Sequence, residues 1–197
     1  MNIQSTLTVE EPAVDLAIAL GYADELENYI IKDDLYRTVW VRTPNGDQSM
    51  QMTIGDLLAR LHRLQAQRST LTAQQQTQLD EVQQRVSSTI YGLRTRAHDR
   101  LQREMKARLD SLKWYLDEGG EDQQRFRGNF PSEMRNRQRI EEILKELGDE
   151  VAPEYKERLK SIDHRIRMMS GASKFIWDER WKEIYPQVPY WYLYVRP

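Results

Sequence analysis

The sequence predicts a mainly α-helical protein: an elongated antiparallel helical hairpin or bundle with a small antiparallel β-sheet. Three observations lead to this fold class. Apolar residues recur every three or four positions through residues 72–116, which is the spacing of one helix face. An Asn45-Gly46 pair separates two short stretches typical of β-strands. Helical patterns resume between glycines and prolines after the long stretch.

Residues 72–116 are expected to form a single long helix. Thr72 and Gln75 have the spacing of a capping box, in which each side chain satisfies a backbone amide at the helix start. Only Gly92 interrupts the apolar pattern, and no proline does. Such a helix spans about 65 Å at 1.5 Å of rise per residue. Because no compact core is that wide, we expect other helices to lie alongside it.

Before the long helix, residues 1–71 are expected to hold a helix, a β-hairpin and a second helix. Pro12 suits the first turn of a helix of about twenty residues, and Gly21 inside it allows close packing. Thr53 is a typical cap for the second helix, which should reach about Gln67. Together these elements form the N-terminal segment of the predicted fold.

The predicted β-hairpin covers residues 36–52. Asn45-Gly46 predicts a type I′ turn, since both residues tolerate positive φ, and this turn places Val41 opposite Met50. Alternation along the strand then puts Trp40 on the other, mixed face. A two-stranded hairpin is marginally stable in water, so it needs a cover or a third strand.

Residues 72–171 form the second predicted segment, the antiparallel helical hairpin itself. A pair of glycines ends the long helix, and residues 132–169 are expected to return along it as a broken arm. One helix of this arm begins at Pro131-Ser132 and ends at Gly148, and the next begins at Pro153. The first two helices of the chain would complete a bundle.

The third segment, residues 172–197, is rich in aromatic residues. Residues 174–185 have the pattern of a short helix, and residues 190–195 alternate as a strand does. Two placements of this strand remain open: beside the 36–52 hairpin, or exposed for a partner's groove or sheet edge. Exposed aromatic patches mark protein interfaces. The predicted protein-interface residues are Trp177, Trp181, Tyr190, Trp191, Tyr192 and Tyr194.

Charge is divided unevenly along the chain. The net charge is −2, but residues 1–59 carry a net −7 and residues 60–115 a net +6. Arg94, Glu104 and Arg108 fall within the apolar stripe of the long helix, so they either form buried charged layers or belong to a ladder that binds phosphates. The candidate nucleic-acid-binding residues are Arg94, Arg96, Arg100, Arg103, Lys106, Arg108, Arg125 and Arg127.

No pattern of catalytic or cofactor-binding residues is present in the sequence. Phosphate-binding glycine loops and the serine nucleophile motif are missing, and the chain has no cysteine. Its three histidines fall in three different predicted helices without metal-ligand spacing. We therefore expect no enzyme activity, no cofactor and no metal, and we assign no catalytic residue.

The sequence thus favours a non-enzymatic interaction or assembly protein, self-associating or part of a larger complex, with a protein as its partner. Nucleic-acid binding through residues 94–108 and the arginine-rich residues 125–139 is the alternative. No signal peptide or membrane-spanning stretch is apparent, so a cytoplasmic location is expected.

Overall fold

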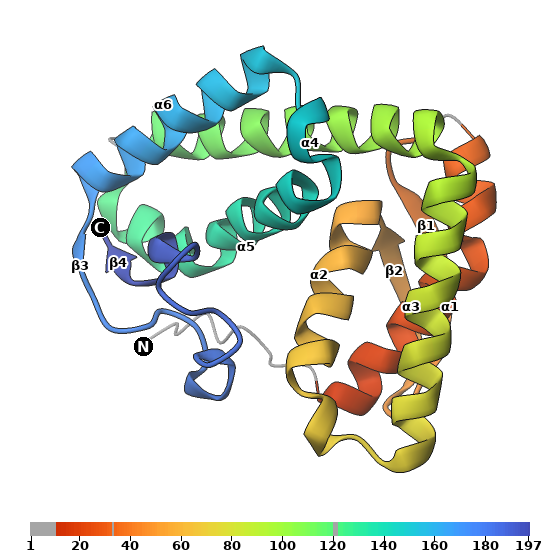
Figure 1. Cartoon of the computed structure of the whole chain (residues 1–197). Helices are drawn as coiled ribbons and strands as arrows, with labels where there is room; N and C mark the ends of the chain where they lie inside the picture. Colours follow the sequence, from red (N-terminus) through yellow and green to blue (C-terminus); the bar gives the residue numbers. More distant parts are fainter. Residues whose placement is uncertain (1–10, 33, 120–121) are drawn as a thin grey trace. The chain divides into compact units, whose positions relative to one another are not determined.

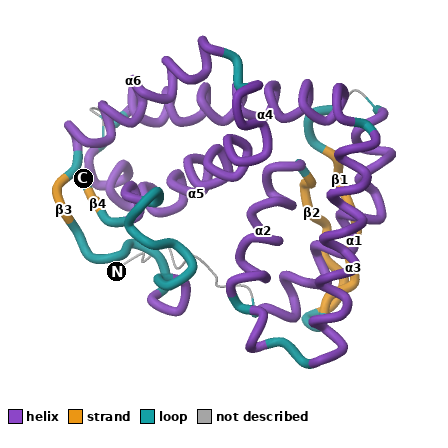
Figure 2. Tube along the Cα trace, in the orientation of Figure 1, coloured by secondary structure: helices purple, strands orange, loops and turns teal. Residues whose placement is uncertain are grey.

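The computed structural model describes residues 11–32, 34–119 and 122–197. Within these residues the chain forms six α-helices and two small two-stranded antiparallel sheets, which confirms the predicted fold class (Figure 1 and Figure 2). In chain order the elements are α1 (Pro12–Ile31), β1 (Arg37–Thr43), β2 (Gly46–Met52), α2 (Ile54–Ala66), α3 (Ala73–Gly92), α4 (Arg94–Glu118), α5 (Gln123–Leu147), α6 (Pro153–Met169), β3 (Gly171–Ala172) and β4 (Val195–Arg196).

The chain divides into two compact units. The first unit contains the described residues from 11 to 104, and the second contains residues 105 to 197 apart from the undescribed pair 120 and 121. Helix α4 carries residues of both units. None of the helices in the described ranges has the length and apolar character needed to cross a membrane.

The prediction of one continuous helix over residues 72–116 is wrong. The predicted capping box is present, but α3 ends at Gly92 and α4 begins at Arg94. Between them Leu93 leaves helical geometry, with φ −114° and ψ 28°, and the chain turns sharply there (Figure 1). Glycine costs about 1 kcal/mol relative to alanine inside a helix. Gly92 is therefore the weakest point of the run, and the helix ends there.

Strands β1 and β2 form the predicted hairpin, but the register differs from the expected one by two residues. Val41 lies opposite Gln48, and the loop is Pro44-Asn45. Gly46 follows it with φ 105°, while no non-glycine residue in the described ranges has positive φ. Proline favours the second position of a type I turn, so Pro44 excludes the expected type I′ turn one residue later. A shift of two leaves each side chain on its predicted face.

The inner face of the hairpin packs against α1. Val39 and Val41 are buried there. A Cβ atom added to Gly21 would lie 2.8 Å from Cγ2 of Val41, so only glycine allows this approach, as the sequence predicted. The Tyr22 hydroxyl donates a hydrogen bond to the carbonyl oxygen of Gln51 at 3.2 Å. The cover that a two-stranded sheet requires is thus helix α1.

Glu104 of α4 binds the start of α2. Its carboxylate, 1% exposed, accepts hydrogen bonds from Thr53 Oγ1 at 2.7 Å and from the Gly55 N–H at 2.9 Å. Thr53 itself caps α2, since its Oγ1 accepts a hydrogen bond from the Asp56 N–H at 3.1 Å. A carboxylate at a helix N-terminus is favoured because free N–H groups and the helix dipole are positive there.

Arg100, one turn before Glu104, binds the end of α1. The guanidinium is 2% exposed and donates hydrogen bonds to the carbonyl oxygens of Ile30, at 3.2 Å, and Asp34. It also lies over the Tyr29 ring, 4.8 Å from the centroid. A cation is favoured at a helix C-terminus, where carbonyl groups lack partners. Buried charge on α4 therefore stabilises the ends of two other helices.

A buried ion network joins α1 to α2. Asp15 accepts hydrogen bonds from Arg60 at 2.5 Å and from Arg63 at 2.8 Å, and Arg60 also donates to Asp56 at 3.0 Å. All four side chains are buried. The network contains two carboxylates and two guanidinium groups, so its charges balance, and it fixes which faces of the two helices meet.

In the second unit, α5 begins earlier than predicted. The sequence placed the helix start at Pro131-Ser132, but α5 starts at Gln123, after an Asp122 cap, and contains Pro131. An interior proline costs about 3 kcal/mol. Burial of Phe126 and Phe130 on the same helix offsets this cost. Tertiary packing thus overrides the local helix-start signal.

Helix α6 does not continue the return arm that residues 132–169 were expected to form. It runs parallel to α4, since Arg158 binds Asp110 and, seven residues further on, Arg165 binds Asp117. The chain reverses after the predicted end of α5, where Gly148 has φ 54°. The second unit therefore holds α5 antiparallel to α4 and α6, which contact each other directly.

The aromatic C-terminal segment contains neither of its two predicted elements. Residues 174–185 hold only a short 3-10 helix, Glu179–Trp181, and Trp191–Leu193 is a second one. The predicted strand 190–195 does not join the 36–52 hairpin. Its last residue begins β4, which pairs with β3 just after α6. Burial of large rings decides this backbone path, so strand-like alternation did not predict it.

The contact between Glu104 and α2 gives a stability test. Glutamine has nearly the same shape as glutamate. Its amide N–H₂ group would face either the Thr53 hydroxyl or the Gly55 N–H, and both of these donate a hydrogen bond to the Glu104 carboxylate. We expect Glu104→Gln to lower the free energy of unfolding by about 1.5–3 kcal/mol, the usual range for hydrogen bonds to charged groups.

Urea denaturation measures this loss. Glu81→Gln, at an exposed position of α3, is the matched control and should change stability by less than about 0.5 kcal/mol. Equal stability of the two variants would contradict the role given to Glu104.

Candidate protein-interaction surfaces

The six predicted interface aromatics lie mostly inside the second unit. Tyr192 is 0% exposed, and Trp177, Trp181 and Tyr190 are also buried, whereas Trp191 and Tyr194 keep part of their surface. Most of these rings pack edge to face in a chain that passes through Tyr185, with the Trp177 and Trp181 centroids 6.0 Å apart. Edge-to-face packing aligns the positive edge of one ring with the negative face of the next. The cluster therefore serves as a core, and an interface role stays a prediction.

Hydrogen bonds fix this aromatic cluster on α5. Trp177 Nε1 donates to the carbonyl oxygen of Pro131 at 2.7 Å. The Tyr190 hydroxyl donates to Glu142 at 2.9 Å and accepts from Lys145 Nζ at 2.6 Å. Burial raises the pKa of Tyr190, and the Glu142 carboxylate raises it further. The C-terminal segment is thus bound to α5 through buried polar contacts as well as through its rings.

Tyr192 is held by a charge rather than by a hydrogen bond. The Arg137 guanidinium lies 4.6 Å from its ring centroid, and Arg137 is itself bound by Asp163 at 2.8 Å and Glu141 at 2.9 Å. The Tyr192 hydroxyl is buried without a hydrogen-bond partner among the described residues. Burial raises the pKa of this tyrosine well above 10.0.

The candidate basic residues divide into two groups. Arg100 and Arg108 are buried, and Arg108 donates a hydrogen bond to Asn136 Oδ1 at 2.9 Å. Of the three charges predicted within the apolar stripe, Glu104 and Arg108 are buried and Arg94 is exposed, and Glu104 contacts the start of a helix rather than a charged layer. The exposed residues are Arg94, Arg96, Arg103, Lys106, Arg125 and Arg127.

On α4 the exposed basic side chains alternate with acidic ones. Asp99 lies between Arg96 and Arg103 in sequence, and Lys106 pairs with Asp110 at 2.9 Å. Spacings of three or four residues put neighbouring side chains on one helix face. This face thus carries mixed charge, whereas a phosphate-binding stripe would be uniformly basic. Nucleic-acid binding stays a prediction, with less support from the structure than from composition.

The outer face of the hairpin is an exposed aromatic surface that the interface prediction did not include. Trp40 is 75% exposed and Tyr36, just before β1, is 49% exposed. Thr38 and Arg42 lie on the same face, since side chains two apart in a strand point the same way. We call these four residues the outer hairpin face. The sequence signal that could have identified this surface was the strand alternation, which put Trp40 on the mixed face.

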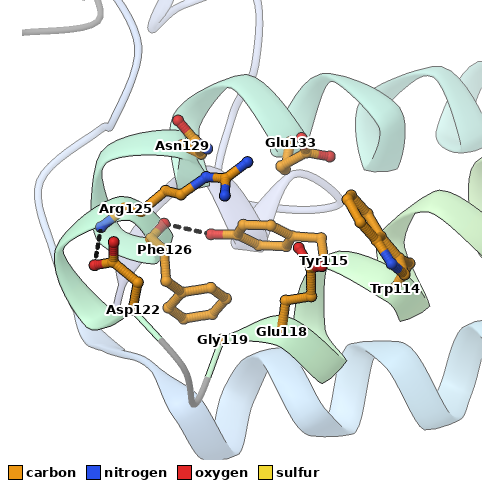
Figure 3. A pocket seen from close by; sticks show the side chains of 9 residues that line it. All are labelled: Trp114, Tyr115, Glu118, Gly119, Asp122, Arg125, Phe126, Asn129 and Glu133. Carbon is orange, nitrogen blue, oxygen red and sulfur yellow. Dashed lines mark hydrogen bonds between the residues drawn. The ribbon is translucent and has the colours of Figure 1, made fainter.

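A small pocket lies between the end of α4 and the start of α5. Its volume is about 170 Å³, and Figure 3 shows the side chains around it. The lining residues are Trp114, Tyr115, Glu118, Gly119, Asp122, Arg125, Phe126, Asn129 and Glu133. Within the described ranges, neither this pocket nor any other place holds three or more histidines or carboxylates arranged to bind a metal ion.

The two buried tyrosines give opposite predictions at neutral pH. Tyr192→Phe removes a hydroxyl without a hydrogen bond, so the free energy of unfolding should stay equal or rise by about 1 kcal/mol. Tyr190→Phe removes one of the hydrogen bonds to the buried Glu142 carboxylate, which keeps those from Gln138 and Lys145, and should lower it by about 1–3 kcal/mol. Thermal and urea unfolding measure both. Destabilisation by Tyr192→Phe equal to that of Tyr190→Phe would show that the Tyr192 hydroxyl makes a stabilising contact.

Alkaline pH gives a second readout of Tyr192. Its raised pKa keeps the phenol neutral in the folded state at pH values where the unfolded chain ionises, so stability should fall as pH rises above 10.0. Tyr192→Phe removes one such group, and its stability should fall less steeply. Unfolding curves between neutral and strongly alkaline pH measure this slope. An unchanged slope would contradict the buried, neutral phenol.

Comparisons with known proteins give no guide to the function of this chain. Neither protein-family models, nor curated proteins, nor solved structures gave a match to it. The features to be explained are therefore the outer hairpin face, the exposed basic side chains and the pocket between α4 and α5.

Proposed function

We propose that this chain is a non-enzymatic interaction or assembly protein that binds a protein partner through its outer hairpin face. The observation that carries the proposal is Trp40, which is 75% exposed on a sheet whose other face is packed against α1. Tryptophan, tyrosine and arginine are the residue types that contribute most to binding at protein interfaces. Trp40 and Arg42 lie on this face of β1, and Tyr36 is exposed just before the strand begins.

Burial of Trp40 offers a partner a large gain in free energy. An aromatic side chain of this size buries about 150–250 Å² in a contact. At about 25 cal/mol per Å² of apolar surface, removing it from water is favourable by several kcal/mol. The polar side chains of Ser49 and Gln51, which lie opposite Trp40 and Thr38, would form a hydrophilic border around this anchor.

The hairpin is also held in place before any partner binds. Its inner valines pack on α1, and Arg37 at the start of β1 pairs with Glu25 of α1 at 2.6 Å. Little conformational entropy is then lost when a partner contacts the outer face. A rigid scaffold with an exposed tryptophan suits recognition better than catalysis, and the second unit supplies further surface, including Trp191 and Tyr194, for a larger assembly.

Substitution of Trp40 tests the proposal. Trp40→Ala removes the anchor and leaves the inner face intact, so stability should change by less than about 0.5 kcal/mol. Its association should weaken by about 2 kcal/mol or more, as for other interface anchors. Analytical ultracentrifugation of the pure protein measures association with a second copy, and affinity purification from the native cell measures binding to another subunit.

Tyr91→Ala is the matched control, because Tyr91 is 79% exposed on α3 of the same unit. It should leave both readouts unchanged. If Trp40→Ala and the wild-type protein show the same mass in solution and the same bound proteins, the proposal is wrong. Binding of labelled RNA or DNA that weakens steeply with salt would instead favour the nucleic-acid alternative.

A further inference from the structure

The pocket between α4 and α5 has an aromatic wall that is fixed by the protein's own contacts. Tyr115 and Phe126 stack with centroids 4.6 Å apart, and the Tyr115 hydroxyl donates to the carbonyl oxygen of Phe126 at 2.6 Å. Trp114 adds an indole ring that is 62% exposed. Tyr115 and Phe126 are each 7% exposed, so Trp114 offers most of the ring surface that a ligand could contact, and ring faces carry partial negative charge.

The carboxylates of the pocket lack cationic partners. Glu118 comes from α4 and Glu133 from α5, and among the described residues no lysine or arginine pairs with either (Figure 3). Glu133 receives only a hydrogen bond of 3.3 Å from the Asn136 amide. By contrast, Asp110 and Asp117 on α4 each bind a lysine and an arginine. Glu118 and Glu133 thus differ from Asp110 and Asp117 in having no ion pair within the described ranges.

Charge and desolvation both favour a positive ligand. Glu118, Asp122 and Glu133 outnumber the single cation of the lining, Arg125. Burial raises the pKa of Glu133, because its charged form has lost water without gaining a cation. A bound cation would restore the lost stabilisation. Figure 3 shows Arg125 beside Asn129 and Glu133 of α5, and Trp114 on the α4 side of the pocket.

We propose that this pocket binds a small organic cation, an alkylammonium or quaternary ammonium compound, between its aromatic rings and the carboxylates of Glu118 and Glu133. Aromatic rings with nearby acids recognise such cations through cation–π attraction. The volume of about 170 Å³ is similar to that of an engineered cavity that holds benzene, so it accommodates a group of a few heavy atoms. This site is independent of the proposed partner surface.

Titration with choline chloride tests the site, with the Trp114 indole N–H signal in NMR spectra as the readout, assigned through Trp114→Phe. We expect a saturable shift in the millimolar range. The neutral carbon isostere of choline, dimethylbutanol, has the same shape without the charge and should shift the signal at least about fivefold less effectively. Equal shifts by both compounds would overturn the proposal, because they would show apolar binding only.

Four variants locate the site. Glu118→Gln and Glu133→Gln should each weaken choline binding about fivefold or more, while Glu154→Gln, an exposed acid on α6, should leave it unchanged. Arg125→Gln removes the competing cation and should tighten binding several-fold. Circular dichroism checks that each variant is folded. Unchanged binding in both glutamate variants, or weaker binding in Arg125→Gln, would overturn the proposal.

The cation site and the outer hairpin face can be tested independently of each other. Trp40→Ala should bind choline as the wild-type protein does, and Trp114→Ala should keep its protein partner. Loss of choline binding in Trp40→Ala would contradict a site confined to the lining residues.

Discussion

Two buried charges one turn apart on α4 hold the first unit together. Arg100 binds carbonyl groups at the end of α1, and Glu104 binds the amide and capping hydroxyl at the start of α2. Each charge has the sign that the helix dipole at that end requires. Because α4 must reach both ends at once, its direction is fixed, and the break at Leu93 allows α3 to take a different direction along α1. The hairpin, held on α1, is positioned by the same contacts.

The second unit is organised by buried rings rather than by helix ends. The C-terminal segment contributes a chain of edge-to-face aromatics, and Arg137 joins Tyr192 to Asp163 of α6. Buried hydrogen bonds from Trp177 and Tyr190 to α5 make this packing directional as well as apolar. This explains why a stretch with the composition of an interface is largely interior: a helical unit of this size needs large side chains to complete its core.

Sequence signals that act within one helical turn predicted the structure well. Features that are decided by contacts with distant residues were not predicted. The capping box at Thr72, the Thr53 cap and the prolines that start α1 and α6 were all correct, since each depends on neighbours in sequence. The start of α5 and the path after Ser170 were wrong, because burial against other elements decides them. For the sites, alternation placed Trp40 outward, but only the fold shows that nothing in the described chain covers it. The pocket could not be predicted, since it depends on how α4 and α5 approach.

The proposed contact between the outer hairpin face and a protein partner can be tested inside the cell. The most direct measurement is site-specific photo-crosslinking in the native cell, with the photoreactive residue in place of Thr38, beside Trp40. Ser87, exposed on α3, is the control position. We expect a discrete protein adduct from position 38, with either a second copy or another subunit, and none from position 87. Adducts of equal yield from both positions, or adducts with nucleic acid alone, would contradict it.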